Sequence, residues 1–411
     1  MPRPAPPAVA APAHLPALDG LRGVAVLLVM VCHFTPELPV RTHLANLMAR
    51  YGELGWVGVD MFFVLSGFLI TRILFASRSD PRYFANFYVR RVLRIFPLYY
   101  LSLFAVFVLL PAFTRAAPPE PAAEHQLWLW TYTANLLVAR RREWLFLTPD
   151  ADLNHFWSLA IEEQFYLFWP LVVARLTRPR LFALAALGLA ASPLLRLALQ
   201  QLFGAAPMTL YTLTPCRLDG LLAGAALAAA FDTPALWRRV RPLAAPALGL
   251  AALGLAAVVV VAGPSPISRV MAVPGYFFVS CLFAALLALV LAAPDGRLAR
   301  ALRGRALATV GKYSYGLYVL HRIGVVRWLV GTDPLTLGRL LLGRAARVGV
   351  AEPVGLAAYV VVCTLVSLPI AYVSYQVVER PFLKLKDAFR PAAVAPAKAP
   401  RSPARRRRVA K

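Results

Sequence analysis

An arginine and a histidine lie in the first long apolar segment of the chain, Arg22 near its beginning and His33 near its end. A helix turns about 100° per residue, so eleven residues return both side chains to within ~20° of one face. At about 1.5 Å per residue, they are roughly 16 Å apart along the axis. The pair predicts a site in which Arg22 holds a phosphorylated donor and His33 acts at its reactive end. The plainer alternatives are an interfacial charge and a helix-packing histidine.

Two arginines form a second candidate feature in RRVLRIFP, residues 90–97. Arg91 and Arg94 are three residues apart and are therefore neighbours on one helix face. Two guanidinium groups in that arrangement can converge on one phosphate through paired hydrogen bonds. The alternative interpretation is that both charges only orient the chain in a membrane.

The segment HFWSLAIEEQFYLFWP, residues 155–170, contains the largest set of polar candidates. His155 and Glu162 are seven residues apart, which is two helical turns on one face. A carboxylate inside an apolar helix needs a partner, such as a histidine or an arginine from another segment. We expect Glu162 to orient the site or to balance its charge. The alternative is an ion pair that only fixes helix packing.

Four further residues are candidates for supporting roles: Asp60 and Ser66 in GVDMFFVLSGFLIT, Arg217 in RLDGLLAG and His321 in SYGLYVLH. Asp60 begins an apolar segment and needs either a partner or water, and the small Ser66 permits a close neighbour. Arg217 and His321 are expected to be structural rather than catalytic. The four cysteines lie far apart in apolar segments, so we expect neither a disulfide nor a metal site.

The composition places these residues in a membrane protein. Of the 411 residues, 60% are hydrophobic and 15% are charged, whereas soluble domains have about 25% charged residues. One span takes about 20 apolar residues. We therefore predict an all-α, polytopic membrane bundle of about ten transmembrane helices, and we expect segment 126–139, which is too short to span upright, to be interfacial or re-entrant. The ten segments are 18–36, 57–75, 96–113, 156–174, 181–203, 216–231, 243–262, 271–292, 309–330 and 355–378.

The net charge of +25 is distributed between the apolar segments and in the C-terminal tail, which argues against nucleic acid as a partner. Arginine-rich loops alternate with poorer ones, and the positive-inside rule assigns the rich loops and both termini to the cytoplasm. This predicts a multi-pass protein of the bacterial inner membrane. We expect a disordered N-terminus (1–16), a membrane domain (17–385) and a basic, disordered tail (386–411) that contacts anionic lipids.

The ordered set of these motifs resembles the acyltransferase 3 family of integral-membrane O-acyltransferases, over about residues 15–385. By this resemblance, Arg22 and His33 match the essential pair of the family, Arg91 and Arg94 its cytoplasmic arginine motif, and Glu162 the acidic position after Trp-Ser-Leu. Some members have an additional extracytoplasmic hydrolase-like domain. We expect this chain, which ends in a basic tail, to act as a single domain or to pass its acyl group to a partner.

Residues and resemblance together predict an O-acyltransferase that moves an acyl group, expected to be acetyl, from acyl-CoA to a hydroxyl. The acceptor is expected to be a carbohydrate, a cell-envelope glycan or a glycosylated metabolite, and no bound cofactor is expected. His33 would be the general base in direct attack, with an acyl-histidine intermediate as the second route. The main rival is a proton-coupled transporter or flippase of a sugar-containing substrate, against which the lack of inverted repeats argues.

Overall fold

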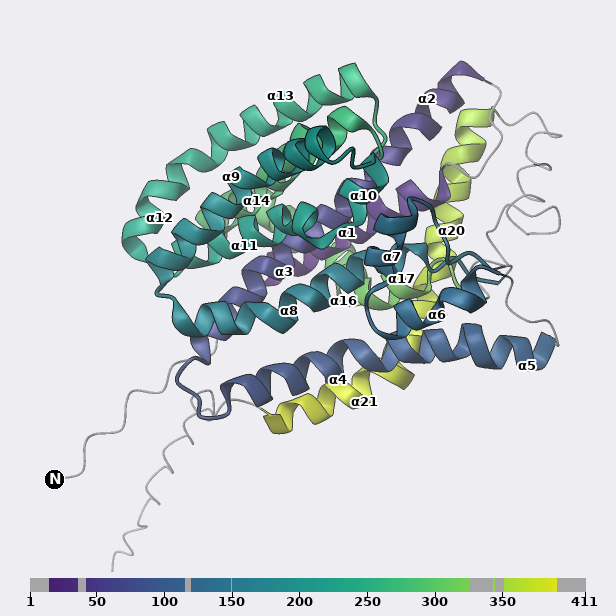
Figure 1. Ribbon diagram of the computed structural model, residues 1–411, viewed down its shortest axis with the longest axis horizontal. Coiled ribbons are helices and arrows are strands. Elements are labelled where there is room, and N and C mark those ends of the chain that lie inside the picture. Colours follow the sequence, from purple (N-terminus) through teal and green to yellow (C-terminus); the bar gives the residue numbers. More distant parts are fainter. Residues whose placement is uncertain are drawn as a thin grey trace, which may run out of the picture.

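The computed structural model describes residues 15–35, 42–114, 120–148, 150–324, 343 and 351–389, and within these residues it is helical without any β-strand. Residues 1–14 of the stretch 1–16, predicted to be disordered, and most of the basic tail lie outside the described residues; Pro16, the last residue of that stretch, already begins a helix. Figure 1 shows the helices as one bundle. The long helices are α1 (Pro16–Phe34), α3 (Val57–Ala76), α4 (Tyr83–Phe104), α8 (Trp157–Arg175), α9 (Arg178–Leu202), α11 (Leu218–Phe231), α13 (Ala244–Ala262), α14 (Tyr276–Ala292) and α20 (Glu352–Ser374).

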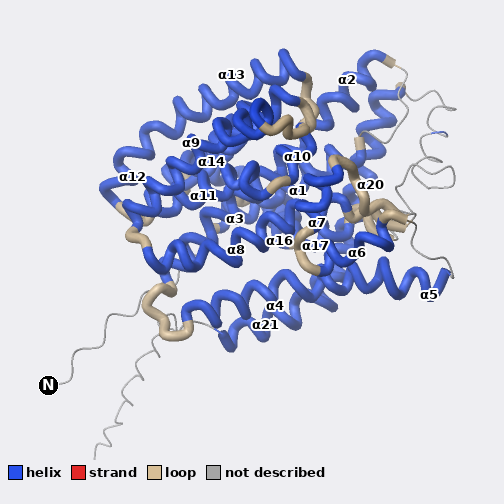
Figure 2. Tube along the Cα trace, viewed as in Figure 1, coloured by secondary structure: helices blue, strands red, loops and turns tan. Residues whose placement is uncertain are grey.

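Shorter elements connect or extend the long helices, and Figure 2 shows the loops gathered mainly near the helix ends. The short α-helices are α2 (His43–Gly52), α5 (Leu110–Thr114), α6 (Ala122–Trp130), α7 (Ala134–Arg141), α10 (Pro207–Thr212), α12 (Pro234–Val240), α15 (Arg297–Leu302), α16 (Arg305–Lys312), α17 (Ser314–Leu320) and α21 (Arg380–Leu385). The 3-10 turns are η1 (Glu53–Trp56), η3 (Asn154–Phe156), η4 (Thr214–Arg217), η5 (Arg241–Leu243) and η8 (Lys386–Phe389). Three π-helical turns are η2 (Ala105–Leu109), η6 (Met271–Gly275) and η7 (Tyr375–Glu379).

Seven stretches of the described chain are long and apolar enough to cross a membrane, which makes this a multi-pass membrane protein. The expected count of about ten is not confirmed. The segments at 156–174 and 216–231 correspond to α8, which contains two adjacent glutamates, and to α11, which has only 14 residues. The segment at 309–330 is divided between α16 and α17, and its last residues lie outside the described part. The seven stretches are Pro16–Phe34, His43–Ala76, Tyr83–Phe113, Arg178–Leu202, Pro234–Ala262, Met271–Ala292 and Glu352–Leu385.

The arginine-rich loops come together at one end of the bundle. Arg78, which follows α3, donates hydrogen bonds to the carbonyls of Leu176 (2.8 Å) and Ala174 (2.6 Å) at the end of α8. Arg72 near the end of α3 forms an ion pair with Asp232 after α11, at 3.1 Å. We call this end, where α1 begins, the Arg22 end. Figure 1 shows the turn from α8 to α9 and helix α12 on this side, at the left.

The opposite end, where α1 finishes, is called the His33 end. There the indole of Trp56 donates to the carbonyl of Pro264 at 3.0 Å, which joins the start of α3 to the loop between α13 and α14. The turn η3 that precedes α8 lies next to Asp152, which is paired with Arg322 at 2.8 Å. Since α8 begins here and finishes beside Arg78, it runs between the two ends although it is not one of the seven apolar stretches.

Small residues bring α3 and α11 into close contact. A Cβ atom added to Gly67 of α3 would overlap the carbonyl of Leu221, and one added to Gly224 of α11 would overlap the carbonyl of Val64. Backbones approach this closely only where side chains are absent. The close approach expected near Ser66 is found at the next residue, Gly67, and the crossing fixes α3 beside the site.

The segment 126–139 does not form a spanning helix. It is divided between α6 and α7, which have nine and eight residues, and the chain turns between them at Tyr132 with φ of 53°. Helices of this length reach only about 12–14 Å, less than half of the ~30 Å hydrocarbon core. Because this segment does not cross the bundle, the loops that follow it still alternate between the Arg22 end and the His33 end.

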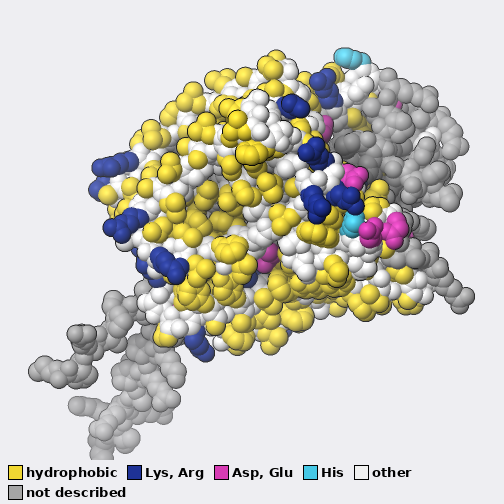
Figure 3. Space-filling model, in the orientation of Figure 1, with side chains coloured by type: hydrophobic (Ala, Val, Ile, Leu, Met, Phe, Trp, Pro, Cys, Tyr) yellow, Lys and Arg dark blue, Asp and Glu magenta, His cyan; other side chains and the backbone are white. Residues whose placement is uncertain are grey.

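The outer surface has the character expected of a lipid-facing bundle. Figure 3 shows hydrophobic side chains over the middle of the face, with lysine and arginine nearer its ends. The side chains of Val260 on α13 and Leu187 on α9 are 85% and 68% exposed. In water such exposure would be unfavourable, whereas in a bilayer these side chains contact acyl chains.

Candidate active site

Two cavities lie along α1, one toward each end of the helix. The first, here called the arginine cavity, has an empty volume of about 820 Å³ and is lined by Arg22, Arg91, Arg94 and Glu162, among others. The second, the histidine cavity, has about 1230 Å³ and is lined by His33, His155, Asp152 and several aromatic rings. Val59 and Tyr318 line both cavities. They therefore form part of the wall between them.

Two helices supply the arginines of the arginine cavity. Arg22 comes from α1, where it forms an ion pair with Asp19 at 3.2 Å, and Arg91 and Arg94 come from α4. The Nε of Arg91 is buried and has no hydrogen-bond partner among the described residues. Its guanidinium lies over the ring of Tyr166 at 6.0 Å. A cavity with three guanidinium groups and an unsatisfied donor is suited to an anionic ligand.

A serine and a glutamate complete this cavity. The Oγ of Ser66 on α3 donates a 2.5 Å hydrogen bond to Oε1 of Glu162 on α8. The neighbouring Glu163 also lines the cavity, and its Oε1 is buried without a partner among the described residues. The structure thus brings together five predicted site residues from four helices: Arg22, Ser66, Arg91, Arg94 and Glu162.

Three histidines meet at the His33 end. Nδ1 of His33 lies 2.7 Å from Nε2 of His321, and the two rings are nearly parallel, with 16° between their planes and centroids 4.9 Å apart. The ring of His155 lies 4.8 Å from that of His321 and 6.1 Å from that of His33, centroid to centroid. Neither nitrogen of His155 makes a hydrogen bond of normal geometry to a described residue. His155 lies in η3, outside the spanning segments, and its burial lowers its pKa to about 4.

Glu162 and His33, both predicted to be catalytic, are not brought together. Glu162 lines only the arginine cavity and His33 only the histidine cavity. Tyr318 stands between them, with its hydroxyl 2.5 Å from Oγ of Ser158 and donating to the carbonyl of His155 at 3.1 Å. Of the two kinds of partner expected for Glu162, a histidine or an arginine, the structure places arginines in the same cavity, and its hydrogen bond is to Ser66.

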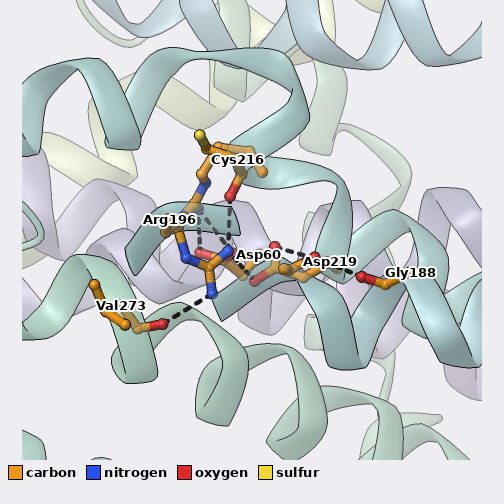
Figure 4. A network of polar contacts seen from close by, with 9 residues as sticks. Asp60, Gly188, Arg196, Cys216, Asp219 and Val273 are labelled. Carbon is orange, nitrogen blue, oxygen red and sulfur yellow. Dashed lines mark hydrogen bonds and ion pairs between the residues drawn. The ribbon is translucent and has the colours of Figure 1, made fainter. Parts of the chain in front are cut away.

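Asp60 and Arg217 line neither cavity and are partners of each other, behind aromatic rings that line the histidine cavity. Arg217 donates to both carboxylate oxygens of Asp60, at 2.7 and 2.8 Å, and both residues are fully buried. The guanidinium of Arg217 also lies 4.1 Å from the ring centroid of Tyr276. Beside this pair, Arg196 of α9 bonds Asp219 at 2.9 Å, as Figure 4 shows together with its bonds to Cys216 and Val273. Their position favours a structural role for this double pair.

Sequence reasoning missed several residues around the site. Arg196 stands inside an apolar segment and satisfies the rule that identified Arg217, so its signal was present. Arg322 adjoins His321 and donates to the carbonyl of His33 at 3.1 Å while it pairs with Asp152. Asp152 lies in a polar loop, where a carboxylate is ordinary, and only the structure reveals its role. No group of three or more His, Cys, Asp or Glu side chains has metal-site geometry within the described ranges.

The chain is similar to a known family and to several known proteins. A family model described as an acyltransferase domain matches residues 15–375. YrhL of Bacillus subtilis (strain 168) is 32% identical over 320 residues, covering 75% of this chain and 48% of that protein. The peptidoglycan O-acetyltransferase OatA of Listeria monocytogenes serovar 1/2a is 28% identical over 331 residues, and the O-acetyltransferase OatA of Staphylococcus aureus (strain NCTC 8325 / PS 47) is 30% identical over 334 residues. Both alignments cover 75% of this chain, with 49% and 50% of the respective relatives. The chain thus spans about half the length of these relatives, and no solved structure matches it significantly.

Proposed function

Since the chain belongs to the acyltransferase 3 family, we propose that it is a membrane O-acetyltransferase that transfers an acetyl group from acetyl-CoA to a hydroxyl of a cell-envelope glycan. The two cavities separate the tasks of such an enzyme. The arginine cavity binds the donor, and the histidine cavity receives the acceptor. The observation that supports the proposal is that the two cavities share a wall, formed in part by Val59 and Tyr318. In the proposed complex the arm of the donor passes this wall, so that its phosphates lie at the arginines and its thioester lies near His33.

We assign the acetyl-CoA site to the arginine cavity because of its positive charge. Coenzyme A has phosphate groups at one extremity and its thioester at the other, on a long thin arm. Arg22, Arg91 and Arg94 bind the phosphates, and the unsatisfied Nε of Arg91 supplies a further donor. The loops at the Arg22 end are rich in arginine, so we place this end in the cytoplasm, where acetyl-CoA is made.

We assign the glycan site to the histidine cavity because of the shape and polarity of its lining. Trp56, Trp144 and Trp157 line the histidine cavity together with Asp152 and Asn154. Flat aromatic faces with a few polar groups suit a sugar ring, whose faces are apolar and whose edges carry hydroxyls. Trp144 is 39% exposed and marks the side from which a long glycan enters. This arrangement agrees with the peptidoglycan named for the Listeria relative.

His33 acts as the general base. It takes the proton from the acceptor hydroxyl while the oxygen attacks the thioester carbonyl carbon. The carbon–sulfur bond then breaks, and the proton passes from His33 to the departing thiolate, so the products are an acetyl ester and CoA. An acetyl-histidine intermediate is the second route. His33 attacks the thioester, the carbon–sulfur bond breaks and CoA leaves as the thiol with the ring proton; the sugar hydroxyl then attacks the acetyl group, and its proton returns to the departing imidazole. Ser66 and Glu162 orient the donor near the arginines.

A transporter or flippase remains the alternative from another class, and the relatives do not favour it. The experiment that separates them uses the purified protein in detergent with acetyl-CoA and a soluble peptidoglycan oligosaccharide. We expect free CoA and an acetylated oligosaccharide in equal amounts, detected by a thiol reagent and by mass spectrometry, without any ion gradient. No product from wild-type protein, with the oligosaccharide recovered unmodified, would contradict the proposed function.

A further inference from the structure

The contact between His33 and His321 is a hydrogen bond between two ring nitrogens, so one nitrogen must donate its N–H and the other must accept with its lone pair. Nδ1 of His33 and Nε2 of His321 are 2.7 Å apart, in a side-chain pair separated by 288 residues in sequence. Either ring can be the donor, because a neutral imidazole has one N–H and one lone pair. The other contacts of His321 decide which ring donates.

The second nitrogen of His321 faces only acceptors. Its Nδ1 lies 3.0 Å from the carbonyl oxygen of Leu317 and 2.9 Å from that of Tyr318, both in α17. Carbonyl oxygens cannot donate, so Nδ1 of His321 must bear a proton. The ring is 1% exposed, so its burial disfavours a positive charge on His321. A neutral ring with a proton on Nδ1 has its lone pair on Nε2, facing His33.

We infer that His321 is a positioning residue that holds His33 in the tautomer with a proton on Nδ1. His33 then donates to His321, and the lone pair of His33 is left on Nε2. Because the side chain of His33 lines the histidine cavity, this nitrogen is the one that takes the proton of the acceptor hydroxyl. His321 takes the place of the carboxylate that accepts from the Nδ1–H of the histidine in a serine hydrolase triad, and the carbonyls of Leu317 and Tyr318 hold His321 in turn.

The same contact assists the reaction after proton transfer. When Nε2 of His33 takes the proton, the ring becomes positively charged and its Nδ1–H bond to His321 strengthens. Arg322 does not add a net charge here, since its guanidinium is paired with Asp152 at 2.8 Å. Its bond to the carbonyl of His33 fixes the end of α1 and thus the position of the ring. This inference rests on the proposed function of His33 as a base.

The tautomer is tested directly by nitrogen NMR. Protonated and unprotonated ring nitrogens differ widely in ¹⁵N chemical shift, so histidine-labelled protein reports the tautomer of each ring at neutral pH. The chain has six histidines, and the signal lost in His33→Ala identifies the relevant one. We expect a protonated Nδ1 and an unprotonated Nε2 in wild type, and a shift toward the other tautomer in His321→Ala. A protonated Nε2 in wild type would overturn the inference.

Substitutions of His321 separate positioning from packing. The amide of glutamine reaches as far as Nε2 of histidine, so His321→Gln places an acceptor oxygen near Nδ1 of His33, whereas the amide of asparagine reaches only as far as Nδ1. We expect His321→Gln to keep kcat within about tenfold of wild type, and His321→Asn and His321→Ala to lose about 10²–10⁴-fold. The KM for acetyl-CoA should stay within a few-fold in all three. Equal losses in all three variants would show a packing role only.

The matched control is His125, a buried histidine of α6 whose Nε2 lies 3.5 Å from Arg141 and which lines neither cavity. His125→Gln should leave the kcat and the tautomer of His33 unchanged, and a matching loss there would overturn the specific role of His321. The NMR reading does not depend on acyl transfer. Absence of transfer by wild type, with the Nδ1–H tautomer present, would therefore contradict the proposed function alone.

Discussion

Oγ of Ser66 donates a 2.5 Å hydrogen bond to Oε1 of Glu162, which joins α3 to α8 inside the arginine cavity. A hydrogen bond to a charged group contributes about 1.5–3 kcal/mol. We expect Ser66→Ala to lower kcat/KM for acetyl-CoA about 10-fold or more in a steady-state assay, because Glu162 then loses its orientation. Ser66→Thr keeps the hydroxyl and should retain activity within a few-fold. Equal activity of the alanine and threonine variants would remove this bond from donor positioning.

Replacement of His33 tests the base. His33→Ala should lower kcat by about 10²–10⁴-fold, which is the usual contribution of a general base, with little change in acetyl-CoA affinity. The measurement is CoA release by purified protein, with binding of acetyl-CoA followed separately by calorimetry. Expression level and the detergent elution profile serve as controls for folding. Activity within a few-fold of wild type would exclude His33 from the mechanism.

The arginines of α4 are expected to behave differently from His33. Arg91→Ala or Arg94→Ala should mainly raise the KM for acetyl-CoA, by an amount that corresponds to about 1.5–3 kcal/mol for one lost charged hydrogen bond. Lysine should rescue only in part, because an ammonium lacks the planar, two-point geometry of guanidinium. If the two residues only set membrane orientation, lysine would restore full activity and the alanine variants would bind acetyl-CoA normally.

The pair of Asp60 and Arg217 is expected to affect stability rather than chemistry. Removing one partner of a buried ion pair typically costs about 3–5 kcal/mol because the other charge is left uncompensated. Asp60→Asn and Arg217→Met should each lower the Tm of the detergent-solubilised protein, measured by tryptophan fluorescence. The double variant should recover part of the loss. An unchanged Tm in both single variants, or a double variant that loses the sum of the two, would contradict this assignment.

Much of the membrane architecture could be predicted because each span needs a long apolar run, and the structure has such runs at α1, α3 and α9. The polar residues inside these runs could be identified as candidates because they stand out among apolar neighbours. The pairing of these residues could not be predicted, because it depends on how distant helices pack. Glu162 was expected to meet a histidine or an arginine; it shares a cavity with three arginines, and its hydrogen bond to Ser66 was not expected. Periodicity placed Arg22 and His33 on one helix face. It did not reveal that they line separate cavities, since Tyr318, which lies between the cavities, is nearly 300 residues away in sequence.

The central claim is that the donor binds at the Arg22 end and the acceptor at the His33 end. It is tested in proteoliposomes, with acetyl-CoA, which does not cross the bilayer, added outside and a soluble peptidoglycan oligosaccharide sealed inside. Protease accessibility of a tag placed after Lys411 selects preparations in which the Arg22 end faces outward. The account predicts acetylated oligosaccharide in the lumen and free CoA outside, and no product when both substrates are outside. Acetylation only when donor and acceptor share one compartment would contradict it.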